Sequence, residues 1–241
     1  MPTAQHLVID EGNSRLKAGV FTNKELTEVV SFDNCGPVFI DWYLPRSSFP
    51  TLVSSVKKEP LEGVTMAGKN LTLYLNHLTL LPITNRYLTP ETLGTDRLAN
   101  ACGGAFLHPG KPVLTIDAGT CLKYDFVNAD AEYLGGSISP GLTMRLEAMH
   151  TFTGKLPLIQ PEPFNRLYGR DTRESLLAGA WGGMLNEMEK TIEKYRASHP
   201  SLVVMLTGGD MPYFEAALKN SIFAPHLTLI GLESIISKNV S

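Results

Sequence analysis

Two short segments of the chain combine an aspartate, a glycine and small polar side chains in the same order. Residues 10–14 read Asp-Glu-Gly-Asn-Ser, and residues 117–120 read Asp-Ala-Gly-Thr. An aspartate carboxylate can hold Mg²⁺, a hard cation that prefers oxygen ligands. Glycine permits a turn that brings backbone N–H groups close to a phosphate. Each segment is therefore expected to bind the phosphate groups of a nucleotide.

Both segments follow a short apolar run, which predicts that a buried strand ends at each aspartate. The runs are Leu7–Ile9 and Val113–Ile116, and the two aspartates lie 107 positions apart in a chain of 241 residues. After the first segment apolar residues alternate from Leu16 to Val20, so a β-hairpin is expected there. A Rossmann turn would pass from strand to helix through Gly-x-Gly-x-x-Gly, which this turn lacks. The repeat indicates two similar domains, 1–110 and 111–241, with a nucleotide phosphate held between them.

Three other segments carry residue types that could do chemistry, and each has a simpler explanation. Residues 94–97, Gly-Thr-Asp-Arg, start a predicted helix, where the aspartate is either a capping residue or a base beside an anion-binding cation. Residues 207–210, Thr-Gly-Gly-Asp, are either a plain turn or a glycine surface against which a nucleobase or ribose packs. Residues 63–70 almost spell the P-loop, but the hydroxyl residue and the following helix are missing, so we interpret them as a chance match.

The composition is that of a globular protein without a strong charge bias. Hydrophobic residues make up 43% of the chain, charged residues 19%, and the net charge is −3, so neither nucleic acid nor an anionic membrane is expected as a partner. No apolar stretch approaches the roughly 20 residues that span a bilayer. Three cysteines without metal-ligand spacing favour a reducing, cytoplasmic location.

The remaining pattern predicts an α/β chain. Strands are expected at Leu7–Asp10, Arg15–Phe21, Leu26–Phe32, Thr51–Val56, Val113–Asp117, Lys123–Asn128, Tyr133–Leu134, Leu202–Leu206 and Leu227–Ile230. Helices are expected at Thr95–Leu107, Leu142–His150, Thr172–Ser198, Tyr213–Asn220 and Leu232–Lys238. Residues 135–141 are expected to turn, residues 38–44 fit a helix or a strand, and residues 57–93 are ambiguous because prolines interrupt the pattern.

Taken in order, the motifs resemble the type III pantothenate kinases, members of the superfamily of acetate kinase, sugar kinases, actin and heat-shock chaperone ATPases. The resemblance spans about residues 6–236 and rests on Asp10-x-Gly12-Asn13-Ser14, Gly94-x-Asp96-Arg97, Asp117-x-Gly119-Thr120 with Asp125, Gly135-Gly136-x-Ile138-x-Pro140-Gly141, Leu156-Pro157, Gly169-x-x-Thr172 and Thr207-Gly208-Gly209. It implies duplicated ribonuclease H-like (actin-like ATPase) domains, with mixed sheets flanked by helices and a cleft between the lobes. It also implies ATP-dependent phosphorylation of pantothenate to 4′-phosphopantothenate, the first step of coenzyme A biosynthesis, by a cytoplasmic homodimer.

The same resemblance implies a role for each candidate residue. Asp10 is expected near Mg²⁺, Asp96 is expected to be the catalytic base, and Asp117 is expected to bind a monovalent cation such as K⁺ or NH₄⁺. The residues expected to bind ATP are Asp10, Gly12, Asn13, Ser14, Lys17, Gly119, Thr120, Gly208 and Gly209. The residues expected to bind pantothenate are Tyr87, Gly94, Thr95, Arg97 and Thr172, the last from its own subunit or from the partner.

Three residues depart from the family pattern. Glu11 stands where an apolar residue is usual, and Cys121 and Lys123 stand where small or hydroxyl residues are usual. A second carboxylate beside the phosphates repels them unless it points away or helps to bind metal. Cys121 and Lys123 could alter ATP binding or cation dependence. Two alternatives therefore stay open: a kinase of the same superfamily with another small hydroxyl or carboxylate substrate, and a non-catalytic nucleotide-binding regulator.

Overall fold

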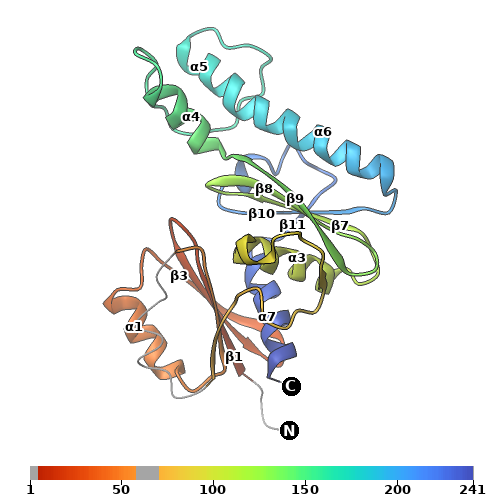
Figure 1. Ribbon diagram of the computed structural model, residues 1–241. Coiled ribbons are helices and arrows are strands. Elements are labelled where there is room, and N and C mark those ends of the chain that lie inside the picture. The colour runs from red at the N-terminus through yellow and green to blue at the C-terminus, as the bar shows by residue number, and fades with distance from the viewer. Residues whose placement is uncertain (1–4, 58–70, 241) are drawn as a thin grey trace. The chain divides into compact units, whose positions relative to one another are not determined.

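The computed structural model describes residues 5–57 and 71–240, which form two compact units (Figure 1). Unit 1 comprises Met1–Pro109, Ala131–Leu134 and His226–Ser241, and unit 2 comprises Gly110–Asp130 and Gly135–Pro225. The C-terminal segment thus belongs to the first unit, whereas the sequence grouped it with the second domain. The P-loop-like segment 63–70 lies outside the described residues.

Unit 1 contains a five-stranded mixed sheet with the order β3-β2-β1-β4-β5. Strand β1 pairs antiparallel with β2 and parallel with β4, so it lies at the centre of the sheet. The elements of this unit are β1 (Gln5–Glu11), β2 (Leu16–Thr22), β3 (Glu25–Phe32), α1 (Pro37–Tyr43), η1 (Leu44–Arg46), β4 (Thr51–Ser55), β5 (Thr72–Tyr74), β6 (Thr84–Asn85), η2 (Pro90–Thr92), α3 (Thr95–Leu107) and α7 (Leu227–Asn239).

Helices cover β1 so completely that successive residues on both of its faces are buried. Leu7, Val8 and Ile9 are all fully buried, although neighbouring side chains on a strand point to opposite faces. Phe39 and Tyr43 of α1 belong to the same hydrophobic cluster as Leu7 and Ile9, and α7 contacts β1, β2 and β4. This packing fixes the position of the end of β1, where Asp10 and Glu11 lie.

Helices α3 and α7 pack closely because glycines line their contact. A Cβ atom at Gly231 of α7 would lie 1.8 Å from the backbone oxygen of Ala99 in α3. A Cβ atom at Gly103 of α3 would lie 2.7 Å from the backbone oxygen of Leu227. Helix α3, which carries the candidate base in its first turn, is therefore held against α7 by direct backbone contact.

Unit 2 contains strands β11, β10, β7, β8 and β9 in that spatial order. Strand β7 pairs antiparallel with β8 and parallel with β10. The elements are β7 (Val113–Ala118), β8 (Cys121–Val127), β9 (Glu132–Pro140), α4 (Leu142–Thr151), α5 (Thr172–Leu177), the π-helical segment η3 (Ala178–Gly182), α6 (Gly183–Ser198), β10 (Val203–Thr207), η4 (Met211–Tyr213) and β11 (Ile222–Phe223). The first residues of β9 belong to unit 1, where they pair with β6.

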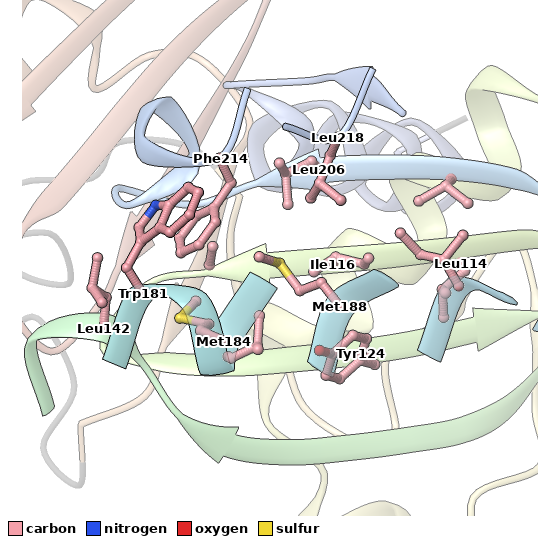
Figure 2. Packing of buried hydrophobic residues seen from close by; sticks show 14 of the residues in the cluster. Leu114, Ile116, Tyr124, Leu142, Trp181, Met184, Met188, Leu206, Phe214 and Leu218 are labelled. Atoms are coloured by element: carbon pink, nitrogen blue, oxygen red, sulfur yellow. The ribbon is translucent and has the colours of Figure 1, made fainter. Parts of the chain in front are cut away.

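The core of unit 2 forms between this sheet and helix α6 (Figure 2). Met184 and Met188 are fully buried and lie one helical turn apart, so they share one face of α6. They pack in one cluster with Leu114 and Ile116 of β7. These contacts bury alternate residues of β7, and the last of them comes directly before Asp117.

Three expected elements are wrong. The expected strand Leu227–Ile230 is the first turn of α7, whose buried residues surround the helix and therefore show no one-sided pattern. The expected helix Tyr213–Asn220 is a short 3-10 helix, Met211–Tyr213, followed by turns. The expected turn at 135–141 is mostly strand, because β9 continues through both glycines to Pro140.

One open assignment is resolved, and the longest expected helix is confirmed with an interruption. Residues 38–44, which fit a helix or a strand, lie mostly in α1, which ends at Tyr43. The long helical segment 172–198 is helical throughout, but a π-helical stretch separates α5 from α6. Among the described residues no helix is both long and apolar enough to cross a bilayer.

Candidate active site

The first candidate segment forms the turn between β1 and β2. Asp10 and Lys17 are register partners on the two antiparallel strands, so their Cα atoms lie directly opposite each other. Residues 12–15 make the turn, in which the N–H of Gly12 donates to the backbone oxygen of Arg15 at 3.0 Å. Asn13 and Ser14 are exposed. The predicted hairpin is confirmed, and its turn presents polar side chains to solvent.

Glu11 lies on the opposite face of β1 from Asp10, because neighbouring residues of a strand alternate. It is only 4% exposed. Its Oε2 accepts a hydrogen bond of 2.7 Å from the Ser55 hydroxyl, and its Oε1 lies 3.1 Å from Nζ of Lys57. The carboxylate is therefore held at the end of β4, and its charge is paired there.

A second pair of hydrogen bonds connects the end of β4 to helix α3. The hydroxyl of Thr95 donates to the backbone oxygen of Ser55 at 3.1 Å and accepts from the Ser54 hydroxyl at 3.0 Å. Glu11, Ser55 and Thr95 thus form a continuous chain of contacts from the first hairpin to the start of α3. The sequence analysis missed both serines, whose only signal was a polar pair ending an otherwise apolar strand.

Asp96 lies in the first turn of α3, one residue after Thr95. Its Oδ1 accepts a hydrogen bond of 2.9 Å from the backbone N–H of Arg97. The N-cap residue is Gly94, and a Cβ atom there would lie 2.7 Å from Oδ1 of Asp96. Glycine at position 94 therefore leaves room for the carboxylate, which the positive end of the helix dipole stabilises.

The next residue, Arg97, is 5% exposed and lies beside an aromatic pair. Its guanidinium carbon is 5.7 Å from the centre of the Tyr87 ring, which in turn lies 6.0 Å from the ring of Tyr133. This distance is within the range of a cation–π contact. Unit 1 therefore brings together four predicted pantothenate residues, Tyr87, Gly94, Thr95 and Arg97. The fifth, Thr172, is exposed at the start of α5 in unit 2.

A histidine of unit 1 that the sequence analysis missed lies close enough to Lys17 to be affected by its charge. Burial, followed by the charge of Lys17, lowers the pKa of His226 from its ordinary value. His226 is the N-cap residue of α7. The neutral imidazole is therefore favoured beside the hairpin ammonium, and the positive charge there is concentrated on the lysine.

The second candidate segment forms the turn between β7 and β8. Asp117 and Lys123 are register partners, and Nζ of Lys123 lies 2.7 Å from Oδ2 of Asp117. Their side chains are only 14% and 16% exposed, respectively. The turn consists of Gly119 and Thr120, and the N–H of Gly119 donates to the backbone oxygen of Cys121 at 3.1 Å. Each of the two carboxylate-bearing segments thus lies in its own hairpin, and in both hairpins an aspartate is opposite a lysine.

The end of β10 packs directly against Asp117. Gly208 has φ +98°, and a Cβ atom there would lie 2.2 Å from the backbone oxygen of Ala118 and 2.5 Å from Oδ1 of Asp117. No residue other than glycine fits this position without movement. Gly209, in contrast, has nothing within 4 Å of an added Cβ. The predicted glycine surface therefore divides into one glycine required by packing and one beside open space.

Asp210 lies close to the same carboxylate and was not among the predicted site residues. Its N–H donates to the backbone oxygen of Ala118 at 2.8 Å. Burial raises the pKa of its carboxyl group, the N–H of Leu142 at the start of α4 opposes that shift, and the charge of Asp117 adds to it. The carboxyl ends of two parallel strands, a common place for ligands in α/β proteins, thus hold two nearby carboxylates.

Helix α4 begins directly over the second turn. A Cβ atom at Gly141 would lie 2.1 Å from the backbone oxygen of Gly119, and the N–H of Gly141 donates to the backbone oxygen of Thr120 at 3.2 Å. The carbonyl groups of the turn are therefore covered by the helix start.

Comparison with known proteins places the chain beside small-molecule kinases. The sequence profile of the family described as Type III pantothenate kinase matches residues 46–194. A relative named Type III pantothenate kinase, from Christiangramia forsetii, is 40% identical and aligns over 97% of this chain and 98% of its own.

Solved structures of low sequence identity share the fold. A Baf family protein from Campylobacter jejuni has 20% identity and a TM-score of 0.64, with 97% of this chain and 98% of that chain covered. A glucokinase from an Antarctic psychrotroph has 10% identity and a TM-score of 0.56, with 97% and 99% covered. The predicted α/β fold class of actin-like ATPases and sugar kinases is confirmed.

Proposed function

The chain belongs to the type III pantothenate kinase family, and on this premise we propose that it phosphorylates pantothenate with ATP, giving 4′-phosphopantothenate and ADP. This is the first step of coenzyme A biosynthesis. The observation that carries the proposal is the chain of contacts from Glu11 through Ser55 to Thr95. It holds the first hairpin, to which we assign phosphate binding, in a fixed position relative to the helix turn that carries Asp96. Phosphoryl transfer to a hydroxyl depends on such positioning.

Asp96 is the base in this proposal. Phosphoryl transfer proceeds mainly by positioning and charge stabilisation, and an aspartate accepts the proton of the attacking hydroxyl. The oxygen of the primary hydroxyl of pantothenate forms a bond to the γ-phosphorus, the bond from that phosphorus to the β–γ bridging oxygen breaks, and the proton passes to a carboxylate oxygen of Asp96. Thr95 holds the start of α3 in place, since its hydroxyl already contacts both β4 serines.

We assign phosphate binding to both hairpin turns. In the first turn, the exposed Asn13 and Ser14 supply side-chain donors, Gly12 supplies the tight turn, and Lys17 supplies a positive charge on the neighbouring strand. In the second, Gly119 and Thr120 supply the turn. Gly208 and Gly209 lie at the end of β10 and are assigned to the adenosine part of ATP, where glycine permits close approach.

Mg²⁺ fits the donor set at the end of β1. Mg²⁺ sites in nucleotide enzymes use one or two carboxylates together with substrate phosphates and water, so a single strand-end aspartate, Asp10, is sufficient. Glu11 does not compete, because its carboxylate is held by Ser55 and Lys57. When bound, the metal ion neutralises charge on the transferred phosphoryl group.

A monovalent cation does not fit at Asp117. The resemblance implies K⁺ or NH₄⁺ there, but Oδ2 of this carboxylate lies 2.7 Å from the Lys123 ammonium and Oδ1 lies against Gly208. An added cation would be repelled by the ammonium. We therefore derive no step of the reaction through a monovalent cation.

Pantothenate binding is assigned to Tyr87, Gly94, Arg97 and Thr172. The Tyr87 ring beside the Arg97 guanidinium offers an apolar wall and a cation to a ligand that carries a carboxylate.

Thr172 contributes from its own subunit or from the partner in the homodimer that we also propose. Light scattering should give twice the chain mass of 26.4 kDa, and we place this homodimer in the cytoplasm, where free thiols such as Cys35 persist.

The test is ADP formation from ATP and Mg²⁺, with and without pantothenate, across a panel of small hydroxyl and carboxylate compounds. Pantothenate should be the preferred acceptor, and preference for another acceptor would favour a related kinase. Asp96→Asn should lower kcat by about two to four orders of magnitude, as is typical for a general base. Asp41→Asn is a matched control on the exposed face of α1 and should retain full activity.

The regulator alternative rests on Glu11 and on the altered second turn, which carries Cys121 and Lys123. The structure pairs that carboxylate with Ser55 and Lys57, so it adds no unpaired charge at the phosphates. ATP binding without turnover under all conditions would nevertheless support the regulator.

A further inference from the structure

The hairpin of unit 2 already carries a cation at Asp117. Nζ of Lys123 lies 2.7 Å from Oδ2 of the carboxylate, and both side chains are more than four-fifths buried. The antiparallel register places the two residues directly opposite each other, so the contact follows from the backbone and does not require a rare side-chain conformation. A lysine ammonium in such a place is stabilised by a carboxylate partner, because an unpaired charge there would lose its hydration.

The other carboxylate oxygen of Asp117 lies close to the backbone that follows β10. A Cβ atom added at Gly208 would lie 2.5 Å from Oδ1 and 2.2 Å from the backbone oxygen of Ala118. The chain therefore leaves no room for a side chain at Gly208 on this side of the carboxylate. Lys123 and the end of β10 therefore enclose the carboxylate from two sides.

Charge balance explains what a cation does at this position. Asp117 and Asp210 lie close enough for the charge of Asp117 to affect the second carboxyl group. Two carboxylates near a nucleotide would repel its phosphates unless a positive charge compensates them. A lysine ammonium is a compact charge with three N–H donors, so it matches NH₄⁺ in charge and offers the same kind of donor.

We propose that the Lys123 ammonium replaces K⁺ or NH₄⁺ at Asp117, and that nucleotide binding and phosphoryl transfer are therefore independent of added monovalent cations. The inference rests on the proposed function in one respect, namely that Asp117 lies near the nucleotide phosphates. Lys123 acts in it as a positioning residue, which neutralises Asp117 and is not consumed or protonated in the reaction.

The first experiment compares turnover in K⁺, NH₄⁺, Na⁺ and choline chloride at equal ionic strength. The wild-type enzyme should show rates within twofold of one another. Lys123→Ser, which replaces the ammonium with a small hydroxyl side chain, should lose at least tenfold in Na⁺ or choline and recover most of that loss in K⁺ or NH₄⁺. Lys190→Ser is the matched control, since it removes a lysine from an exposed ion pair of the same unit and should show no cation dependence.

A second readout uses nucleotide binding without pantothenate. Calorimetry should give one Kd for ADP in all four salts for the wild type. For Lys123→Ser, the Kd should be at least fivefold weaker in choline than in K⁺. Because this measurement needs no turnover, it tests Lys123 even if pantothenate is not the substrate.

Three results would overturn the proposal. In the first, K⁺ improves the turnover or the ADP affinity of the wild type more than twofold. In the second, the Lys123→Ser enzyme matches the wild type in every salt. In the third, the Lys123→Ser enzyme is folded but no monovalent cation restores its activity. Absence of pantothenate phosphorylation in every salt is a separate result. It would contradict the proposed function, and the ADP affinities would still decide the role of Lys123.

Discussion

The β1–β2 hairpin and the β7–β8 hairpin both place an aspartate opposite a lysine, but their turns are built differently. The first turn spans residues 12–15 and exposes Asn13 and Ser14. The second spans only residues 119–120, and the start of α4 covers its carbonyl groups. The longer turn offers side-chain donors to a ligand, whereas the shorter one is held by backbone packing.

The residue after each aspartate extends the difference. Glu11 reaches Ser55 and Lys57, and so connects the first hairpin through side chains to β4 and α3. Ala118 instead accepts the N–H of Asp210 through its backbone oxygen, against which Gly208 also packs. Mutations in the first hairpin should therefore affect mainly activity, and mutations at the closely packed glycines around the second should affect mainly stability.

Among changes to the two hairpins, Asp10→Asn should have the largest effect on the chemistry. Removing the carboxylate assigned to Mg²⁺ should lower kcat by about a hundredfold to a thousandfold, the usual cost of losing one preorganised electrostatic contact to the transition state. Steady-state kinetics at saturating ATP and pantothenate measure this loss, and circular dichroism checks the fold. Activity above a tenth of the wild type would remove Asp10 from the metal site.

Around the two hairpins, Gly141→Ala should have the largest effect on stability. The added methyl group would overlap the backbone oxygen of Gly119, which lies 2.1 Å from the position of its Cβ. We expect the free energy of unfolding to fall by about 2–4 kcal/mol, within the range of severe packing defects. Chemical denaturation measures it.

The first turn supplies the comparison for this substitution. A Cβ at Gly12 would lie 3.3 Å from the nearest atom, so Gly12→Ala should cost less than about 1 kcal/mol. Gly154→Ala is a neutral control, because nothing lies within 4 Å of its Cβ. Equal losses for Gly141→Ala and Gly12→Ala would contradict the difference between the turns.

Asp117→Asn should destabilise the protein by about 1–3 kcal/mol, because it leaves the mostly buried Lys123 ammonium without its carboxylate. Thermal unfolding should show a loss of roughly 2–4 °C for each kcal/mol. The double variant Asp117→Asn/Lys123→Met should be more stable than Asp117→Asn alone, since it removes both charges. A double variant whose loss equals the sum of the losses of Asp117→Asn and Lys123→Met would show that the pair is not coupled.

Asp210→Asn should have the smallest effect, and it should depend on pH. Burial and the charge of Asp117 raise the pKa of Asp210, so the folded protein favours the protonated carboxyl and ionisation opposes folding. This cost is absent below the ordinary pKa near 3.9 and complete above the raised value. The variant should thus be more stable than the wild type at pH 7, and the gain should disappear as the pH falls toward about 4. A constant difference at all pH values would contradict this origin.

The sequence predicted the parts of the site that depend on local pattern. Both hairpin strands preceding the aspartates and the helix after Gly94 follow from apolar spacing and turn residues, and the structure confirms them. The contacts of Glu11 with Ser55 and of Asp117 with Lys123 could not be predicted in this way, because they depend on which residues face each other across paired strands.

The errors in the fold have the same origin. Leu227–Ile230 is apolar at most positions because α7 is buried on several sides, and such a run fits a strand as well as a helix. Nothing in its local sequence shows that it packs on β1 and α3, which lie far away in the chain.

The most direct test of the proposed reaction is to follow the γ-phosphate itself. The protein would be incubated with ATP labelled on the γ-phosphoryl group, Mg²⁺ and pantothenate, and the labelled products would be separated and quantified beside ADP. The account predicts labelled phosphopantothenate in an amount equal to ADP, and loss of that product in Asp96→Asn. Label found only in inorganic phosphate, or no ADP formed at all, would contradict it.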